Sequence, residues 1–265
     1  MPFGGLGNRM RVMNSGFHLS RALDTSVSII WLQKAELNAS LSSLFSNVGF
    51  SYRLVSGFRY ALSLCFLKHI FIQKYPTFYR FFLRFFYDCI LFDDELKMIS
   101  QEKLIQKIGN SKHIFIATCY AFYPFDSFDN YLINNDLKEK VDAINLPENT
   151  IGVHIRRTDH VYIIQESSFE NYIEKMKIEQ HKNKDVCFYV ATDDDSVKQE
   201  LKTIFGQKIR TQNIELSRAT EEGIFGAVVD IYALARCSKI ICNTKSSFAT
   251  TAQQLGSTKE IIEVR

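Results

Sequence analysis

Short apolar runs and amphipathic segments alternate through the second half of the chain. Apolar runs bounded by polar residues predict buried strands, and apolar residues three and four apart predict helices. Strands are expected at 151–155, 186–191, 208–210, 239–242 and 260–264, and helices at 168–181, 196–205, 222–236 and 246–255. This alternation predicts an α/β fold whose mainly parallel sheet carries helices on both faces. In such sheets, ligands bind beyond the carboxyl ends of the strands.

The first half of the chain is less regular. A glycine-rich turn, Gly4–Asn8, precedes segments that predict helices at 9–23, 100–108 and 130–144 and strands at 27–32 and 113–119. Met1–Phe3 is too short for a full strand before that turn, so we expect either that a first strand is missing or that the true start lies upstream. We place a domain boundary in the loop Pro147–Asn149, which divides the chain into domains 1–146 and 147–265.

Composition and charge narrow the class of protein. With 46% apolar and 23% charged residues, the chain can build a globular core. A net charge of +3 suits an anionic small ligand or an anionic membrane surface, but it is too weakly basic for a nucleic-acid-binding protein. The six cysteines form neither a C-x-x-C pair nor a zinc-like cluster, which favours a cytoplasmic location. A membrane-spanning segment is not expected, because charges interrupt the apolar stretches.

Two adjacent arginines follow the strand predicted at 151–155. Arg156 and Arg157 repel each other unless an anion or carboxylates compensate, and the guanidinium fork suits phosphate oxygens. His154 lies on the strand itself, and Asp159 is placed to orient one arginine. The alternative is a surface pair between an arginine and Asp159.

Acidic and hydroxyl side chains occupy other positions of interest. Asp193, Asp194 and Asp195 follow a predicted strand; capping of the next helix explains at least one of them, and another is expected to contact a ribose, a base or a neighbouring arginine. Asp230 interrupts an apolar helix and needs a partner there, for which an arginine is the simplest choice. Ser246 and Ser247 open a helix, where they either cap it or help to bind an anion.

Three of these motifs, taken in order, resemble a known family. Residues 151–159, residues 191–194, and Asp230 together with Ser246 and Ser247 resemble three signatures of the α1,6-fucosyltransferases and the nodulation-factor fucosyltransferases. Residues 4–10 look more like the opening of the α1,2-fucosyltransferases. The resemblance implies a GT-B fold of two Rossmann-like domains. It also implies GDP-fucose as donor, inversion at the anomeric carbon, and neither metal nor cofactor.

The resemblance also implies roles for individual residues. Arg156 would contact the β-phosphate with support from Arg157, and residues 147–265 would form the nucleotide-sugar domain. A preplaced guanidinium would stabilise the charge on the departing diphosphate in place of a metal. The remaining candidates for binding GDP-fucose are His154, Asp159, Asp193, Asp194, Asp230, Ser246 and Ser247 in the C-terminal domain and Gly5, Gly7 and Asn8 in the N-terminal, acceptor-side domain.

The general base is less well defined by the resemblance. The family has a Glu a few residues after the Asp of its first signature; here the ungapped position is Ile164, and Glu166 lies two residues on. We expect Glu166 to be the base, provided that it reaches the acceptor hydroxyl. Two alternatives stay open: a transferase for another nucleotide sugar, such as GDP-mannose, and an inactive module that binds a nucleotide sugar or a glycan.

The expected acceptor is a glycan or a glycolipid. Residues 41–91 are rich in aromatic and basic side chains, and Arg80–Phe86 has the pattern of an amphipathic helix. We favour the interpretation that these aromatic residues form the core of the acceptor domain. The alternative is peripheral contact with the inner membrane, which would carry a lipid-linked acceptor.

Overall fold

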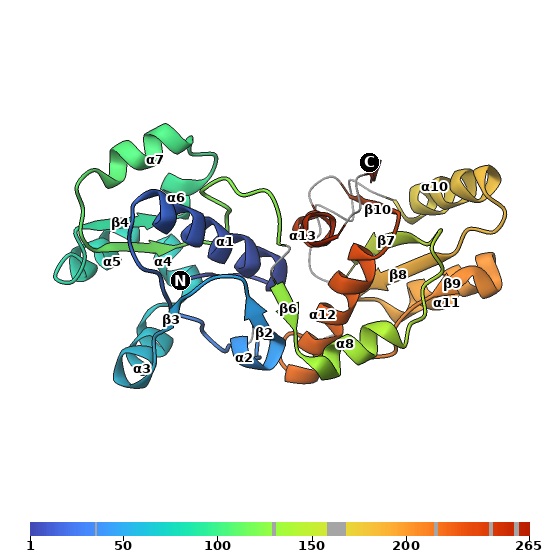
Figure 1. Ribbon diagram of the computed structural model, residues 1–265, viewed down its shortest axis with the longest axis horizontal. Helices are drawn as coiled ribbons and strands as arrows, with labels where there is room; N and C mark the ends of the chain where they lie inside the picture. Colours follow the sequence, from blue (N-terminus) through green and yellow to red (C-terminus); the bar gives the residue numbers. More distant parts are fainter. Residues whose placement is uncertain (35, 129–130, 158–167, 215–216, 244–245, 257–259) are drawn as a thin grey trace. The chain divides into compact units, whose positions relative to one another are not determined.

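The computed structural model describes residues 1–265 except 35, 129–130, 158–167, 215–216, 244–245 and 257–259. The chain forms two compact units (Figure 1). Unit 1 consists of Met1–Leu41 and Gly49–Asp126, and unit 2 consists of Ser42–Val48 and Ser127–Arg265. The boundary predicted at residues 146 and 147 therefore falls inside unit 2, and the division of function between the two predicted domains stays a prediction.

Unit 2 is built on a five-stranded parallel sheet in the order β11–β10–β7–β8–β9. The strands are β7 (Ile151–Ile155), β8 (Phe188–Thr192), β9 (Ile209–Arg210), β10 (Lys239–Asn243) and β11 (Glu260–Val264). The apolar runs thus form strands where the sequence predicts them. The central strand β7 has β10 and β8 as neighbours, so three carboxyl ends meet at the middle of one edge.

Helices cover both faces of this sheet. Ile151, Val153 and Ile155 of β7 pack into one core with α10 (Phe169–Lys182) and α11 (Asp195–Phe205). Gly152 faces the other way, because a Cβ there would lie 2.6 Å from Leu234 of α12. That close approach explains the glycine, and since side chains alternate along a strand, it also places His154 on the α12 face. This face carries α12 (Glu221–Ala235), which packs against α13 (Ser247–Leu255) and α8 (Asn135–Asp142).

One predicted helix of unit 2 is partly wrong. Residues 130–144 were expected to be helical, but Tyr131–Ile133 form strand β6, and only Asn135–Asp142 are helical. β6 pairs antiparallel with β2 (Phe45–Val48), and the side chains of Tyr131 and Ile133 are buried. Residues 131–133 therefore form a strand because they pair with a segment that is distant in sequence. The local pattern of apolar residues does not reveal such a pairing. Two short elements remain: α2 (Leu41–Leu44), which precedes β2, and η1 (Gly206–Lys208), which precedes β9.

Unit 1 contains short parallel strand pairs. β1 (Ser28–Ile29) pairs with β3 (Arg53–Leu54), and β4 (Cys89–Phe92) pairs with β5 (Ile114–Ala117). The first residues run parallel to β5: the amino group of Met1 donates to Ile116 O over 2.7 Å, and Phe3 N donates to Thr118 O over 2.9 Å. Met1–Phe3 is thus strand-like in its pairing despite its length. The helices of the unit are α1 (Leu6–Ala22), α3 (Gly57–Phe66), α4 (His69–Lys74), α5 (Pro76–Leu83), α6 (Asp93–Leu96) and α7 (Gln101–Ile108).

The aromatic residues around α5 are not the core of unit 1. Of this segment, Tyr79 and Leu83 are buried, one helical turn apart, and they pack against the strands. Phe81, Phe85 and Phe86 are exposed. Phe82 is exposed as well, so the interpretation that Arg80–Phe86 supplies an aromatic core is wrong for all four of its phenylalanines. Within the described part of the chain, no helix has the length and apolarity needed to cross a membrane.

Candidate functional site

The carboxyl end of β7 brings His154 to the start of α13. The Nδ1 atom of His154 lies 2.9 Å from Ser246 Oγ, and its ring stacks on Phe248 with centroids 4.8 Å apart. Ser246 also caps α13, since its Oγ accepts a hydrogen bond from Ala249 N over 3.1 Å. Both interpretations of Ser246 can hold together, because one hydroxyl caps the helix and fixes the histidine ring.

His154 is a neutral imidazole over the physiological range. Burial, assisted by the positive charge of Arg156, lowers the pKa of His154 to about 4, although Asp193 acts in the opposite direction. A neutral ring can accept a hydrogen bond from the Ser246 hydroxyl at Nδ1, which leaves Nε2–H as a hydrogen-bond donor. The site can therefore present a neutral donor beside an arginine without adding a second positive charge.

Arg157 and Asp193 link the ends of two neighbouring strands. Arg157 N donates to Asp193 Oδ1 over 2.8 Å, which ties the segment after β7 to the segment after β8. The guanidinium of Arg157 lies over the ring of Phe169, 5.5 Å from its centroid. Arg156 and Arg157 are both partly buried. The predicted arginine pair and Asp193 are thus brought together at the edge where a parallel sheet binds its ligands.

The other two acidic residues after β8 have structural roles. Asp194 caps α11 and accepts hydrogen bonds from Ser196 N at 2.9 Å and Ser196 Oγ at 2.6 Å, which lower the pKa of Asp194. Asp195 forms an ion pair with Lys198 at 2.8 Å. Helix capping therefore accounts for Asp194, and Asp193 is the acidic residue that holds the arginine segment.

Asp230 joins a different buried group. It is 2% exposed and accepts a hydrogen bond from the hydroxyl of Tyr189 over 2.6 Å. Burial raises the pKa of Asp230 to about 7, opposed by its hydrogen bonds with Tyr189 and Gln212 and by the charge of Lys198. The expected arginine partner is wrong, since a tyrosine on β8 takes that place. Contact of Asp230 with a guanosine stays a prediction.

Three further candidates are less informative. Ser247 is the first residue of α13, and its carbonyl accepts a hydrogen bond from Thr251 Oγ1 over 2.8 Å. Asp159 and Glu166 lie outside the described residues. The roles expected for these three residues therefore stay predictions.

The candidates in unit 1 lie at the start of α1. Gly5 precedes the helix as its N-cap, Gly7 lies in its first turn, and Asn8 Oδ1 accepts a hydrogen bond from Arg11 over 2.7 Å. Arg9, which is 1% exposed, holds the turn in place by donating to Gly4 O over 3.0 Å and to Leu32 O over 2.7 Å. Sequence reasoning missed Arg9. A Cβ on Gly5 would meet nothing within 4 Å, so the packing of the protein itself does not require that glycine.

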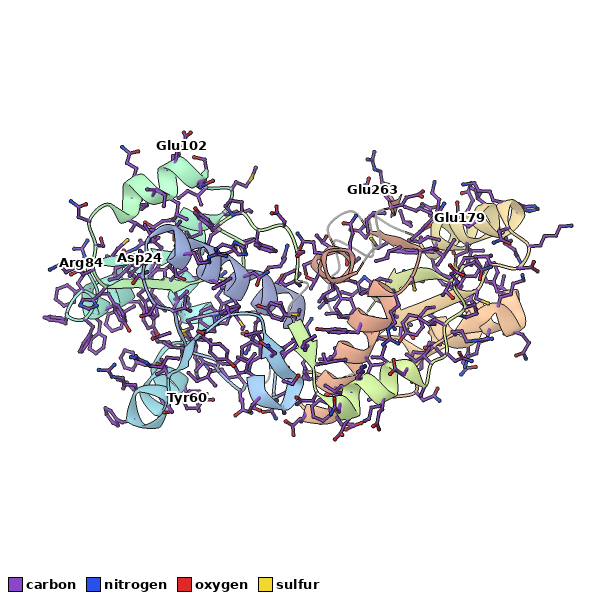
Figure 2. All side chains as sticks on the ribbon, in the orientation of Figure 1. Asp24, Tyr60, Arg84, Glu102, Glu179 and Glu263 are labelled. Atoms are coloured by element: carbon purple, nitrogen blue, oxygen red, sulfur yellow. The ribbon has the colours of Figure 1, made fainter. Side chains whose placement is uncertain are left out.

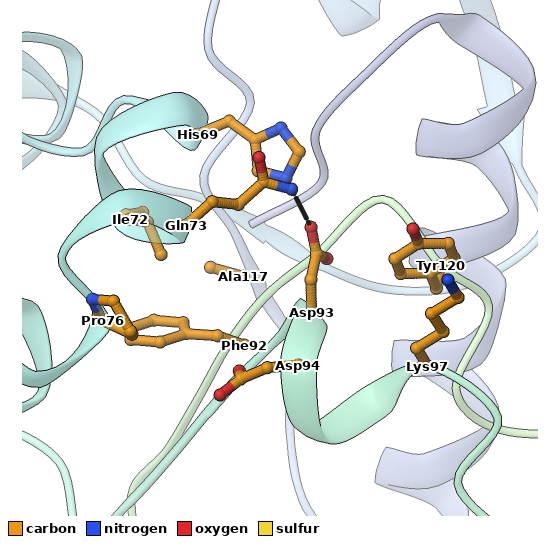
Figure 3. Close-up of a pocket in the computed structure, with 10 residues that line it drawn as sticks. All are labelled: His69, Ile72, Gln73, Pro76, Phe92, Asp93, Asp94, Lys97, Ala117 and Tyr120. Atoms are coloured by element: carbon orange, nitrogen blue, oxygen red, sulfur yellow. Dashed lines mark hydrogen bonds and ion pairs between the residues drawn. The ribbon is translucent and has the colours of Figure 1, made fainter.

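A second polar site, which we call the Asp93 pocket, lies beyond the carboxyl ends of β4 and β5 (Figure 3). Its cavity has a volume of about 300 Å³. Asp93 lies in the middle of it, between Gln73 on one side and Tyr120 and Lys97 on the other. The other residues lining the pocket are His69, Ile72, Pro76, Phe92, Asp94 and Ala117.

Asp93 is held by several donors from different elements. Its Oδ2 lies 2.6 Å from His69 Nε2 and accepts from Gln73 Nε2 over 3.0 Å, while its Oδ1 accepts from Thr118 Oγ1 at 2.5 Å and Cys119 N at 3.1 Å. Burial alone would raise the pKa of Asp93, but these hydrogen bonds outweigh it and lower the pKa to about 2. The carboxylate is therefore charged and fixes the residues around it.

Polar atoms of the Asp93 pocket remain available to a ligand. Within the described chain, His69 Nδ1, Gln73 Oε1 and the Tyr120 hydroxyl make no hydrogen bond. His69, Asp93 and Cys119 also offer ligand atoms within 4.8 Å of one another, a donor set that a metal ion can use. Sequence reasoning missed this pocket. Its signal was an apolar run, Cys89–Phe92, that ends directly in acidic residues.

Comparison with known proteins decides the family. Residues 102–258, more than half of the chain, match the family model of the α-(1,6)-fucosyltransferase N- and catalytic domains. The chain belongs to this fucosyltransferase family. The protein is accordingly a glycosyltransferase, as its sequence motifs predict.

Solved structures agree in fold along nearly the whole chain. The fucosyltransferase NodZ from Bradyrhizobium is 19% identical with a TM-score of 0.64, and the match covers 98% of this chain and 92% of that one. A mutant of FUT1 from Arabidopsis thaliana is 14% identical with a TM-score of 0.66, covering 100% and 70%. POFUT1 is 12% identical with a TM-score of 0.55, covering 98% and 95%. These matches confirm the predicted α/β fold of GT-B type with mainly parallel sheets.

Proposed function

We propose that this protein transfers L-fucose from GDP-fucose to a glycan hydroxyl, with inversion at the anomeric carbon and without a metal. The observation that carries the proposal is the group of His154, Ser246, Arg156 and Arg157 at the carboxyl edge of the unit 2 sheet. Relatives of the same fold support the donor: NodZ has been co-crystallised with GDP and soaked with GDP-fucose, and FUT1 has been solved with GDP.

The diphosphate would bind where the arginines and α13 meet. Backbone N–H groups at a helix start and guanidinium groups both favour phosphate oxygens. Arg156 would contact the β-phosphate and Arg157 would support it, while Ser246 or Ser247 would approach the phosphates. His154 and Asp230 would lie near the guanosine, and Asp193 would keep the arginine segment in place through its hydrogen bond to Arg157 N.

The reaction would be a single displacement. The acceptor hydroxyl attacks the anomeric carbon of fucose, the bond from that carbon to the β-phosphate oxygen breaks, and a base takes the hydroxyl proton. Negative charge grows on the departing GDP, and Arg156 would stabilise it in the transition state. We assign Glu166 as the base, following the family motif, with Asp159 orienting an arginine.

The acceptor would bind in unit 1. The Asp93 pocket offers a cavity for it beyond the carboxyl ends of β4 and β5, while Gly5, Gly7 and Asn8 at the start of α1 stay predicted to bind GDP-fucose. The unpartnered hydrogen-bonding atoms and the apolar lining of the pocket suit a sugar residue. The predicted cytoplasmic location is supported by six free cysteines.

A transfer assay tests the proposal. The full chain is incubated with GDP-fucose, GDP-mannose or UDP-glucose in the presence of EDTA, and released nucleotide is measured with and without a glycan mixture. We expect GDP release from GDP-fucose to exceed that from the other donors and to persist in EDTA. Faster release from GDP-mannose would establish the alternative donor, and no release from any donor would favour the inactive binding module.

The Asp93 pocket makes the metal question testable. If activity falls in EDTA and returns with Zn²⁺, a metal held by His69, Asp93 and Cys119 becomes the first explanation. The variant Cys119→Ser separates the cases, since it would abolish such a rescue and would leave a metal-independent enzyme active. Cys119 is suited to this test because burial and the nearby Asp93 raise the pKa of its thiol to about 12, so without a metal it is a neutral side chain.

A further inference from the structure

The most unusual surface of the molecule is formed by α3, α4, α5 and the residues that follow α5. We call it the aromatic surface. It contains eleven of the sixteen exposed large hydrophobic side chains found in the described part of the chain. These are Phe58, Leu62, Phe66, Ile70, Phe71, Tyr75, Phe78, Phe81, Phe82, Phe85 and Phe86. Phe66 of α3 meets Phe78 and Phe82 of α5, with ring centroids 6.5 and 5.4 Å apart, and exposed apolar side chains that gather in this way mark a site of interaction.

The helices of this surface have apolar residues on both faces. A helix that packs on a core normally exposes polar side chains on its outer face. On α5, Tyr79 and Leu83 face the core of unit 1, whereas Phe78 and Phe81 are 57% and 69% exposed. On α4 only Ile72 is buried, and on α3 only Ser63. The described residues of the fold therefore leave the apolar outer faces of these helices uncovered.

The same segment is uniformly basic. Residues 37–87 contain no Asp or Glu, but they contain Arg53, Arg59, Lys68, Lys74, Arg80 and Arg84. The rest of the chain has more acidic than basic residues, so the positive net charge of the protein comes from this segment. Arg80 pairs with Asp94 and Glu95. Lys68 and Lys74 instead lie over the rings of Phe71 and Tyr75, at 5.6 and 5.3 Å from the ring centroids.

Together, these features select one kind of partner. We propose that the aromatic surface docks unit 1 on a membrane that contains anionic lipids. Aromatic side chains enter the boundary between headgroups and acyl chains, while Lys and Arg neutralise lipid phosphates. Arg84, which is labelled in Figure 2, ends α5, and the exposed Phe85 and Phe86 follow it directly in the sequence. The apolar residues are distributed over three short helices. This distribution is typical of a surface that lies on a membrane and does not cross it.

Charge also argues against a second copy of the chain. A twofold interface would place the same basic segment on both sides and bring like charges together. The docking surface does not depend on the identity of the sugar donor. The Asp93 pocket, which is the proposed acceptor site, is lined by His69 and Gln73 of α4 and Pro76 of α5, and both helices belong to the aromatic surface. If the proposed transfer is correct, membrane docking therefore suits an acceptor that is attached to a lipid.

Vesicle sedimentation of the full chain tests the docking surface without any donor. One set of vesicles is pure phosphatidylcholine, and the other is an equal mixture of phosphatidylcholine and phosphatidylglycerol. We expect sedimentation with the mixed vesicles that is at least about tenfold stronger than with the neutral ones and that weakens with salt. Absence of binding to the mixed vesicles would overturn the proposal.

Matched variants locate the contact. The double variant F81S/F85S removes two rings from the aromatic surface, and K74E/R84E reverses two charges there. The controls are I178S/I204S and K177E in unit 2, where Ile178 and Ile204 are 40% and 41% exposed. We expect both surface variants to lose about tenfold or more in vesicle binding, with circular dichroism melting unchanged, and the controls to bind as wild type.

Two results would overturn membrane docking by the aromatic surface. If the surface variants bind vesicles as strongly as the controls, the contact lies elsewhere and the proposal is wrong. If wild type is a dimer by light scattering and F81S/F85S is a monomer, the aromatic surface is an interface between copies. Loss of transfer activity alone decides neither, since vesicle binding is measured in the absence of GDP-fucose.

Discussion

Each unit places a histidine at the carboxyl edge of parallel strands, but the two histidines have different partners. In unit 2, Nδ1 of His154 meets the Ser246 hydroxyl, and Arg156 lies nearby. In unit 1, Nε2 of His69 meets the charged carboxylate of Asp93. A neutral imidazole beside arginines suits an anionic diphosphate. An imidazole bonded to a carboxylate presents its other nitrogen as an acceptor, which suits a neutral sugar hydroxyl.

Two sites at the carboxyl edges of parallel strands can therefore carry charges of opposite sign. Both sites use the edge of a parallel sheet, and the residue that follows each strand sets the charge. After β7 it is an arginine, and after β4 it is Asp93. The following variants test whether the two sites differ in this way, in order of decreasing expected effect.

The largest effect is expected at Asp93. Asp93→Ala leaves the donors of His69, Gln73, Thr118 and Cys119 without their acceptor, and we expect unit 1 to lose about 3 kcal/mol of unfolding free energy. Urea denaturation measures the loss. The control Asp94→Ala removes a neighbouring carboxylate whose ion pair with Arg80 is exposed, and it should change stability by less than about 1 kcal/mol. Equal losses in the two variants would show that Asp93 has no special structural role.

The next effect concerns pH and His154. Folding lowers the pKa of His154 from 6.5 to about 4, so the unfolded chain binds the proton more tightly and protonation favours unfolding. Stability from this histidine is present above about pH 6.5 and is lost as the pH falls towards 4. We expect wild type to lose about 2 kcal/mol relative to His154→Gln between pH 7 and pH 5.

Asp230 acts in the opposite direction over a similar range, which is why a variant must serve as the reference. Its pKa is raised on folding from 3.8 to about 7, so its contribution is present below pH 3.8 and is lost as the pH rises through 7. Asp230 is the same in wild type and in His154→Gln, so its contribution cancels in the difference between their denaturation curves. A difference that does not change with pH would contradict a neutral His154 whose pKa is lowered on folding.

The smallest effect is expected at the rim of the Asp93 pocket. Tyr120→Phe removes one unpartnered hydroxyl, and we expect the KM for the acceptor to rise about fivefold, as for the loss of one hydrogen bond, while the affinity for GDP-fucose stays unchanged. Tyr123→Phe is the control, because Tyr123 accepts a hydrogen bond from Gln101 and does not line the pocket. A change in donor affinity with no change in acceptor KM would mean that the pocket does not bind the acceptor.

The sequence predicted unit 2 much better than unit 1. In unit 2 the central strands β7, β8 and β10 are almost entirely buried, and each precedes a helix that packs in this unit, so apolar runs such as Ile151–Ile155 are decisive. In unit 1 the paired strands are short, and the helices from α3 to α5 expose apolar side chains on their outer faces. A rule that places aromatic residues in the core therefore failed at Phe81 and Phe85.

The candidate sites show the same limit. Arg156, Arg157 and His154 could be found because unusual polar residues stand directly at a strand end. The partner of Asp230 could not, because Tyr189 lies 41 residues away and belongs to an ordinary-looking strand. His69 was missed for a similar reason, since its link to Asp93 crosses from α4 to α6 and depends on how the helices pack.

The central claim is that the arginine at the end of β7 binds the diphosphate of GDP-fucose without a metal. Calorimetric titration of GDP-fucose in EDTA tests it, on wild type, on Arg156→Ala and on the control Arg236→Ala, which removes an exposed pair with Asp142. We predict binding to wild type and to the control, and a loss of about 100-fold in Arg156→Ala, as expected for a charge-assisted phosphate contact. Equal affinity in all three proteins would contradict the account.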